Sequence, residues 1–153
     1  MSSMQMQTGA ERGAASGADK PIDHVAIVVR DLERTIDLYT KTLGFRQVYR
    51  ETVADQNVEA VGLQAGESVI ELLRPLAADS PLVAYLGEAE SKLHHTAYRV
   101  DDLAGELARL KEAGVRLIDE HPRRGAHGNL IAFLHPKSTG GVLIELCQHG
   151  GGA

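Results

Sequence analysis

The sequence repeats itself once, and this internal duplication restricts the fold more than any other feature. Residues 22–45 align with residues 93–116 at an offset of 71. The equivalent pairs include His24 and His95, Ala26 and Ala97, Val29 and Val100, and Asp31 and Asp102. Both segments begin with a β-like stretch, pass an aspartate suited to cap a helix, and continue with apolar residues at helical spacing. Gly44 and Gly114 are expected to end the two helices.

The C-terminal parts of the two halves also correspond to each other. GESVIELL (66–73) and GGVLIELC (140–147) each carry one carboxylate, Glu71 or Glu145, inside an apolar strand. Their offset is 74, so the second half contains three additional residues in a loop. Further strand-like runs occupy 45–53 and 57–65 in the first half, and 115–120 and 129–135 in the second. Each half is therefore predicted to be a β-α-β-β-β module.

The two modules, about 21–76 and 92–149, are expected to pack as one α+β domain over residues 21–149. A four-stranded half has little core of its own, which favours a fused unit. Residues 1–20 are rich in Gly, Ser and Ala and lack the apolar segment of a secretory signal. We interpret them as a disordered extension or a cloning remnant.

The duplication places one histidine and one glutamate at matched positions in each half. A lone histidine opening a strand is more often a structural residue, and a lone glutamate in an apolar strand more often faces water at an edge. Four such residues at equivalent positions favour a shared cation, because a buried carboxylate is costly unless its charge is compensated. His₂Glu₂ donors suit Co, Mn, Zn, Ni or Fe. His94 rivals His95, but strand alternation turns only one inward, and the repeat selects His95.

Composition excludes several classes of function. The net charge is −5 with lysine and arginine spread thinly, which argues against a nucleic-acid partner. No apolar run approaches the roughly 20 residues that span a bilayer. The single cysteine, Cys147, excludes an internal disulfide and lies in an apolar run, where a core role is expected. A cytoplasmic protein without a membrane partner is predicted.

Residues 21–148 resemble the methylmalonyl-CoA epimerase family of the vicinal-oxygen-chelate superfamily, which also contains glyoxalase I and extradiol dioxygenases. The most specific segment is FLHPKSTGGVLIEL (133–146), supported by IDHVAI (22–27) and LHHTAYRVDDL (93–103). The resemblance implies two fused modules forming one curved mixed sheet around a metal site. It also implies an acyl-CoA substrate, a homodimer, and interconversion of the (R) and (S) forms of methylmalonyl-CoA. The implied metal ligands are His24, Glu71, His95 and Glu145.

The implied reaction removes and returns a proton beside a thioester, through an enolate that a divalent ion stabilises. Glu145 is a candidate base, because a carboxylate that binds metal through one oxygen keeps the other free. Several relatives place a second glutamate at the position of Ala60. Here Glu59 comes one residue earlier and faces the opposite side of a regular strand, so it serves only if a one-residue bulge presents it; another group or a water is the alternative.

Loop residues are the candidates for substrate binding. Lys137 and Ser138 precede the strand of Glu145 and are assigned to the carboxylate or thioester end of the substrate. Arg123, Arg124 and His127 are candidates for the acyl or CoA end. Solvated loop charges are an equally good interpretation of each arginine.

Three rival functions stay open. A glyoxalase I-type lyase uses the same kind of ligand set. An extradiol dioxygenase is less favoured, because such sites keep three protein ligands and four are available here. A non-enzymatic ligand-binding module of the same fold would commonly lack the metal ligands.

Overall fold

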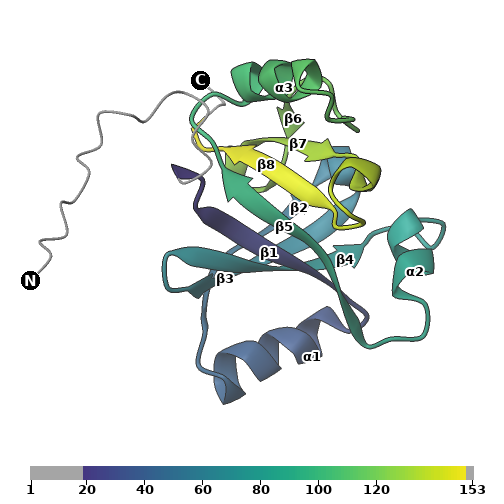
Figure 1. Ribbon diagram of the computed structural model, residues 1–153. Coiled ribbons are helices and arrows are strands. Elements are labelled where there is room, and N and C mark those ends of the chain that lie inside the picture. The colour runs from purple at the N-terminus through teal and green to yellow at the C-terminus, as the bar shows by residue number, and fades with distance from the viewer. Residues whose placement is uncertain (1–18, 151–153) are drawn as a thin grey trace, which may run out of the picture.

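One mixed sheet of eight strands organises the computed structural model, which describes residues 19–150 (Figure 1). The strands are β1 (Ile22–Val29), β2 (Arg46–Val53), β3 (Val58–Ala65), β4 (Ser68–Pro75), β5 (Ser91–Arg99), β6 (Arg123–Arg124), β7 (Leu130–Leu134) and β8 (Ile144–Gln148). Their order is β2-β3-β4-β1-β5-β8-β7-β6. The predicted extension lies outside the described residues, apart from its last two.

The helices are short. The α-helices are α1 (Leu32–Asp37), α2 (Pro81–Leu86) and α3 (Leu103–Glu112), and α1 continues as a π-helix, η2 (Leu38–Thr42). Three 3₁₀ turns follow strands: η3 (Ala54–Gln56), η4 (Ala126–Gly128) and η5 (Pro136–Ser138). Within residues 19–150, no helix has the length and apolarity needed to cross a membrane.

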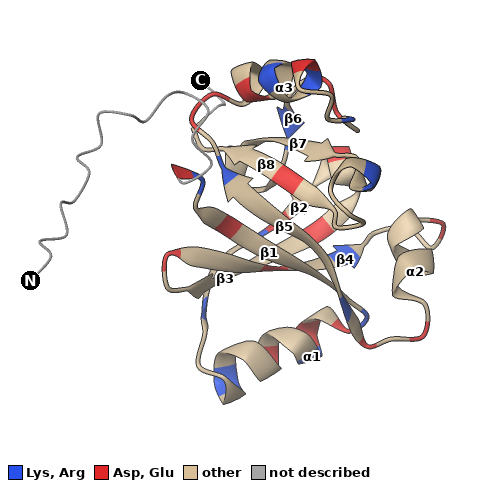
Figure 2. Ribbon diagram, viewed as in Figure 1, with Lys and Arg blue, Asp and Glu red and all other residues tan. Residues whose placement is uncertain are grey.

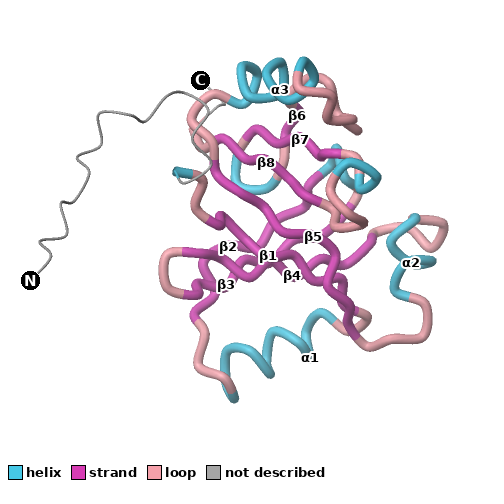
Figure 3. Tube along the Cα trace, viewed as in Figure 1, coloured by secondary structure: helices cyan, strands magenta, loops and turns pink. Residues whose placement is uncertain are grey.

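The predicted duplication is confirmed as β1-α1-β2-β3-β4 followed by β5-α3-β6-β7-β8. In each module the last strand lies parallel to the first, β4 beside β1 and β8 beside β5. The modules join through the antiparallel pair β1–β5, so the order β4-β1-β5-β8 forms the centre of the sheet. Figure 3 shows the strands turning progressively across this curled sheet.

The same capping chemistry starts both main helices. Asp31 accepts a hydrogen bond from the backbone N–H of Arg34, and Asp102 accepts one from Gly105, each at 3.1 Å. Glycines in the left-handed region follow both helices, Gly44 with φ 84° and Gly114 with φ 89°, as the sequence predicts.

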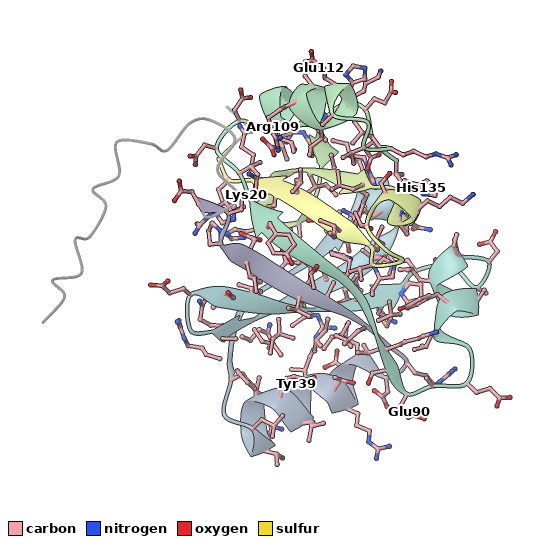
Figure 4. The ribbon with its side chains drawn as sticks, viewed as in Figure 1. Lys20, Tyr39, Glu90, Arg109, Glu112 and His135 are labelled. Atoms are coloured by element: carbon pink, nitrogen blue, oxygen red, sulfur yellow. The ribbon has the colours of Figure 1, made fainter. Side chains whose placement is uncertain are left out.

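Helices α1 and α3 cover one face of the sheet, whereas α2 packs through Leu82 on the face that holds the site. Beneath α1 lies a cluster of Val29, Leu32, Ile36, Val61, Leu63 and Leu72. Beneath α3 lies its counterpart, Val100, Leu103, Leu107, Ala132, Leu134 and Leu146. Tyr39 packs against the first cluster from the α1 side (Figure 4). Residues that alternate with these clusters along the strands therefore face the opposite side of the sheet.

The strand predicted over 115–120 is wrong. Only an isolated bridge forms there, between Leu117 and Leu134, and the edge strand β6 begins later. The cause is a competing contact: the Asp119 carboxylate accepts the Phe133 N–H at 2.8 Å, while the Phe133 carbonyl accepts N–H bonds from Ile118 and Asp119. A side chain has thus taken the place of a ladder bond.

Candidate metal centre

Four adjacent central strands each contribute one polar residue to the same region of the face opposite α1 and α3. His24 lies on β1, Glu71 on β4, His95 on β5 and Glu145 on β8. Pairing aligns them, because Ala26 lies opposite both Glu71 and His95. All four are buried, with 2–6% of their surface exposed. Figure 2 shows an acidic position within β1 and another within β8.

The donor atoms converge closely. His24 Nε2 lies 3.2 Å from His95 Nε2, and the Glu145 carboxylate bridges the two imidazoles at 3.3 Å and 3.1 Å. Glu71 Oε1 lies 3.9 Å from His24 Nε2. Buried nitrogen and oxygen atoms facing one another in this way match the ligand chemistry of a divalent transition metal. The residues present therefore fit such an ion.

Protons and a cation would compete for this centre. Although burial opposes it, hydrogen bonds to Asp23 and Glu145 raise the pKa of His24 to about 10. Burial likewise disfavours ionised Glu145, yet hydrogen bonds from His24 and His95 lower its pKa to about 2. Burial raises the pKa of Glu71 above its usual range. Without a metal, the imidazolium of His24 compensates the charge of Glu145.

Three of the four ligand candidates also contact a residue outside the centre. His24 Nδ1 lies 2.7 Å from the Asp23 carboxylate, His95 Nδ1 lies 2.8 Å from His94 Nδ1, and Tyr49 donates to Glu71 at 2.6 Å. Such partners fix ligand orientation in metal sites. His94 contacts His95 through the ring nitrogen that faces away from His24 and Glu145. Burial, followed by the neighbouring His95, lowers the pKa of His94 to about 4 and keeps it neutral.

A cavity of about 70 Å³ opens beside the centre. Its walls include His24, Glu71 and Glu145 together with Tyr49 and His127. The His127 ring stacks on Tyr49, with centroids 5.2 Å apart and planes at 23°. Of the predicted substrate-binding residues, His127 is thus the one that borders the cavity.

The structure does not bring Glu59 to this cavity. It pairs with Arg50 at 2.6 Å and with Arg74, on the face that carries α1. Hydrogen bonds from Arg74 and Arg50 lower the pKa of Glu59. Strands β3 and β4 stay in continuous register from Val58 to Ala65, so no bulge there turns Glu59 inward.

Lys137, Ser138 and Arg124 also lie outside the cavity lining. Ser138 Oγ accepts the Arg116 N–H at 2.9 Å, and Lys137 donates its backbone N–H to His135 Nδ1 at 3.1 Å. Both contacts shape the turn η5. Arg124 is exposed on the edge strand β6. A substrate role for these three residues stays a prediction.

Comparison with known proteins agrees with the fold and with the geometry of the site. Residues 23–133 match the Glyoxalase/Bleomycin resistance protein/Dioxygenase superfamily, the group also called vicinal-oxygen-chelate. The chain belongs to this superfamily. This confirms the family and fold predicted from the sequence.

Individual members of the superfamily are similar over nearly their whole length. The ethylmalonyl-CoA/methylmalonyl-CoA epimerase of Cereibacter sphaeroides is 39% identical over 129 residues, which cover 83% of this chain and 96% of the relative. The crystal structure of methylmalonyl-CoA epimerase from Mycobacterium tuberculosis is 38% identical with a TM-score of 0.79, covering 83% of this chain and 86% of that one. The structure of a methylmalonyl-CoA epimerase in complex with methylmalonyl-CoA and NH₄⁺ is 33% identical with a TM-score of 0.79, and the match covers 86% of this chain and 96% of that one.

Two residues that contact the metal centre, Asp23 and Tyr49, were not predicted from the sequence. Asp23 lies directly before His24 and could have been found from that adjacency. Tyr49 is 22 residues from the Glu71 that it contacts and belongs to no repeated motif. The sequence offered only an indirect indication of Tyr49, which is the glycine, Gly62, at the position opposite it in β3. Cys147 is buried, as expected of a core residue, and burial raises the pKa of its thiol.

Proposed function

We propose that the protein is a metal-dependent epimerase that interconverts (R)- and (S)-methylmalonyl-CoA. The observation that carries this proposal is the convergence of His24, His95 and Glu145, with Glu71 Oε1 3.9 Å from His24 Nε2, beside a cavity. The similarity to the epimerase of Cereibacter sphaeroides covers 83% of this chain, and the superfamily match over residues 23–133 contains His24, Glu71 and His95.

His24, Glu71, His95 and Glu145 are the proposed ligands of one divalent ion, drawn from Co, Mn, Zn, Ni or Fe. When bound, the ion would supply Lewis-acid stabilisation of negative charge on the substrate's thioester oxygen. The proposed substrate is an acyl-CoA whose acyl end enters the cavity. His127 borders that entry and is the proposed contact for it.

Glu145 is the proposed base. Its carboxylate would take the proton from C2, while the electron pair of the C–H bond moves toward the thioester carbonyl. A proton returned to the opposite face of the planar carbon gives the other epimer. Glu59 has no part in this exchange, because it lies on the far face of the sheet. Another group of the cavity or a water would exchange the proton on the opposite face.

The test is isotope exchange. The protein, loaded with Co²⁺, is incubated with methylmalonyl-CoA in D₂O, and deuterium at C2 is followed by mass spectrometry together with loss of optical activity. We expect both signals, and we expect a chelator to abolish both. Absence of exchange in the metal-loaded protein would refute the proposal.

A glyoxalase I-type lyase is the second candidate, because enzymes of that type also use paired histidines and glutamates from repeated modules. An assay with the hemithioacetal of methylglyoxal and glutathione separates the two, and we expect no turnover. Ethylmalonyl-CoA is assayed in parallel, since the Cereibacter sphaeroides relative is named for both substrates. We further expect a cytoplasmic protein that forms a homodimer, and sedimentation of the purified protein would check the dimer.

A further inference from the structure

We propose that Tyr49 is a positioning residue of the metal centre: its hydroxyl holds one oxygen of Glu71, so that Glu71 serves the metal through the other oxygen alone. This inference rests on the proposed metal centre and adds a residue that lies outside the repeated ligand motif.

The contact has the geometry of a strong hydrogen bond. Tyr49 Oη lies 2.6 Å from Glu71 Oε2, within the roughly 2.5–2.7 Å range of bonds from a hydroxyl to a carboxylate. The other oxygen, Oε1, is the one directed toward the centre, 3.9 Å from His24 Nε2. The two oxygens of one carboxylate therefore have different partners.

The ring of Tyr49 has little freedom to leave this position. Tyr49 lies opposite Gly62 in the β2–β3 pair, next to a register shift between Gln47 and Tyr49. A Cβ at position 62 would lie 2.1 Å from Tyr49 Cε1, so only glycine leaves room for the ring. From the other side the ring is covered by His127. A bulge that aims a side chain beside a site is a recurrent device in sheets.

The consequence concerns charge as well as orientation. Two ionised carboxylates and two neutral imidazoles would offset the full charge of a divalent ion. A hydroxyl that donates to Glu71 draws electron density away from the ligand oxygen, and the ion keeps more of its capacity to attract a substrate oxygen. It also leaves Oε2 occupied, so that this oxygen does not take a coordination position that a substrate needs.

The experiment uses Co²⁺, whose visible absorption weakens as its coordination number rises. Wild-type and Tyr49→Phe proteins are titrated with Co²⁺ without substrate, and their spectra are compared. We expect the variant to bind Co²⁺ with weaker visible bands, because the freed Oε2 joins the metal. We also expect kcat to fall about tenfold with KM nearly unchanged.

The matched control is the same substitution in a Glu71→Gln background. There the spectrum should not respond to Tyr49→Phe, because the second carboxylate oxygen is gone. An unchanged spectrum for Tyr49→Phe alone, or an equal change in the Glu71→Gln background, would overturn the inference. Failure of the wild-type protein to bind Co²⁺ would instead refute the metal centre itself.

Gly62→Ala tests the placement of the ring independently. The added methyl group displaces Tyr49 while every ligand stays in the sequence. We expect the spectral change of Tyr49→Phe to be reproduced, with folding monitored by circular dichroism. A folded Gly62→Ala protein with the wild-type spectrum would contradict the proposed role of the Tyr49–Gly62 pair.

Discussion

At the scale of single residues, environment decides what a carboxylate does. Glu106 is as poorly exposed as the site glutamates, at 8%, yet it pairs with Arg109 at 2.6 Å and Lys20 at 3.4 Å. Figure 4 shows Lys20 and Arg109 on the α3 side of the molecule. Glu145 is neighboured by imidazoles instead and borders the cavity. Burial alone therefore does not mark a site, whereas burial with converging donors does.

Glu145→Gln tests the proposed base. The amide keeps the size of the side chain but cannot accept the C2 proton, so epimerisation should fall at least a hundredfold. Glu106→Gln is the matched control, a glutamate of similar burial outside the site, and should retain wild-type kcat. Both variants are assayed by deuterium exchange at saturating Co²⁺. Wild-type exchange in Glu145→Gln would remove Glu145 from proton transfer.

Glu59→Ala tests the sequence-based candidate that the fold places elsewhere. Because Glu59 faces Arg50 and Arg74, we expect kcat within about twofold of wild type. The free energy of unfolding should fall by about 1 kcal/mol or less, the usual size for exposed ion pairs. Urea unfolding and the exchange assay measure the two quantities. A hundredfold loss of kcat in a stable variant would return Glu59 to the mechanism.

At the scale of elements, the sequence predicted what local chemistry specifies. The capping aspartates and closing glycines gave both main helices, and alternation gave most strands. Helix α2 was not predicted, and two other elements differ from the prediction. The strand predicted over 115–120 does not form, because the tertiary contact of the Asp119 side chain replaces a ladder bond. The end of α1 continues as the π-helix η2, which helical spacing does not reveal.

Asp102→Ala tests the cap of α3. Loss of the side-chain acceptor for the Gly105 N–H should lower the free energy of unfolding by about 1 kcal/mol. Asp102→Asn keeps an acceptor and should cost much less. Denaturant unfolding of the three proteins gives the comparison. Equal stability of the alanine and aspartate forms would show that packing alone holds the helix start.

At the scale of the whole molecule, the duplication predicted the candidate site because each ligand is tied to a repeated strand. The modules meet at β1–β5, and this pairing brings the two histidines together. Tyr49 could not be predicted in the same way. Its contact depends on the register shift in β2 and on space left by Gly62, neither of which has an equivalent in the second half.

The link between the modules should make stability of the metal-free protein depend on pH. The pKa of His24 is raised from 6.5 to about 10, so its imidazolium contributes stability that is complete below pH 6.5 and is lost as pH rises toward 10. We expect the Tm advantage of wild type over His24→Gln to shrink across that interval. Calorimetry of both chelated proteins provides the measurement. A constant difference would contradict the linkage.

Metal binding should stabilise the fold as one unit. A cation that binds only the folded state, at a thousandfold excess over its Kd, adds about 4 kcal/mol to the free energy of unfolding. We therefore expect Co²⁺ to raise Tm and a chelator to reverse the rise. Glu71→Gln should retain part of this increase, and a His24→Gln, His95→Gln double variant none. Equal increases in all three would place the ion elsewhere.

The antiparallel seam between β1 and β5 has a consequence for assembly. A strand shifted by a single residue presents its alternate side chains, so a misaligned seam would turn His24 away from His95 and toward the helices. Binding of the proposed ion would then stabilise only the chain whose two modules have paired in the correct register.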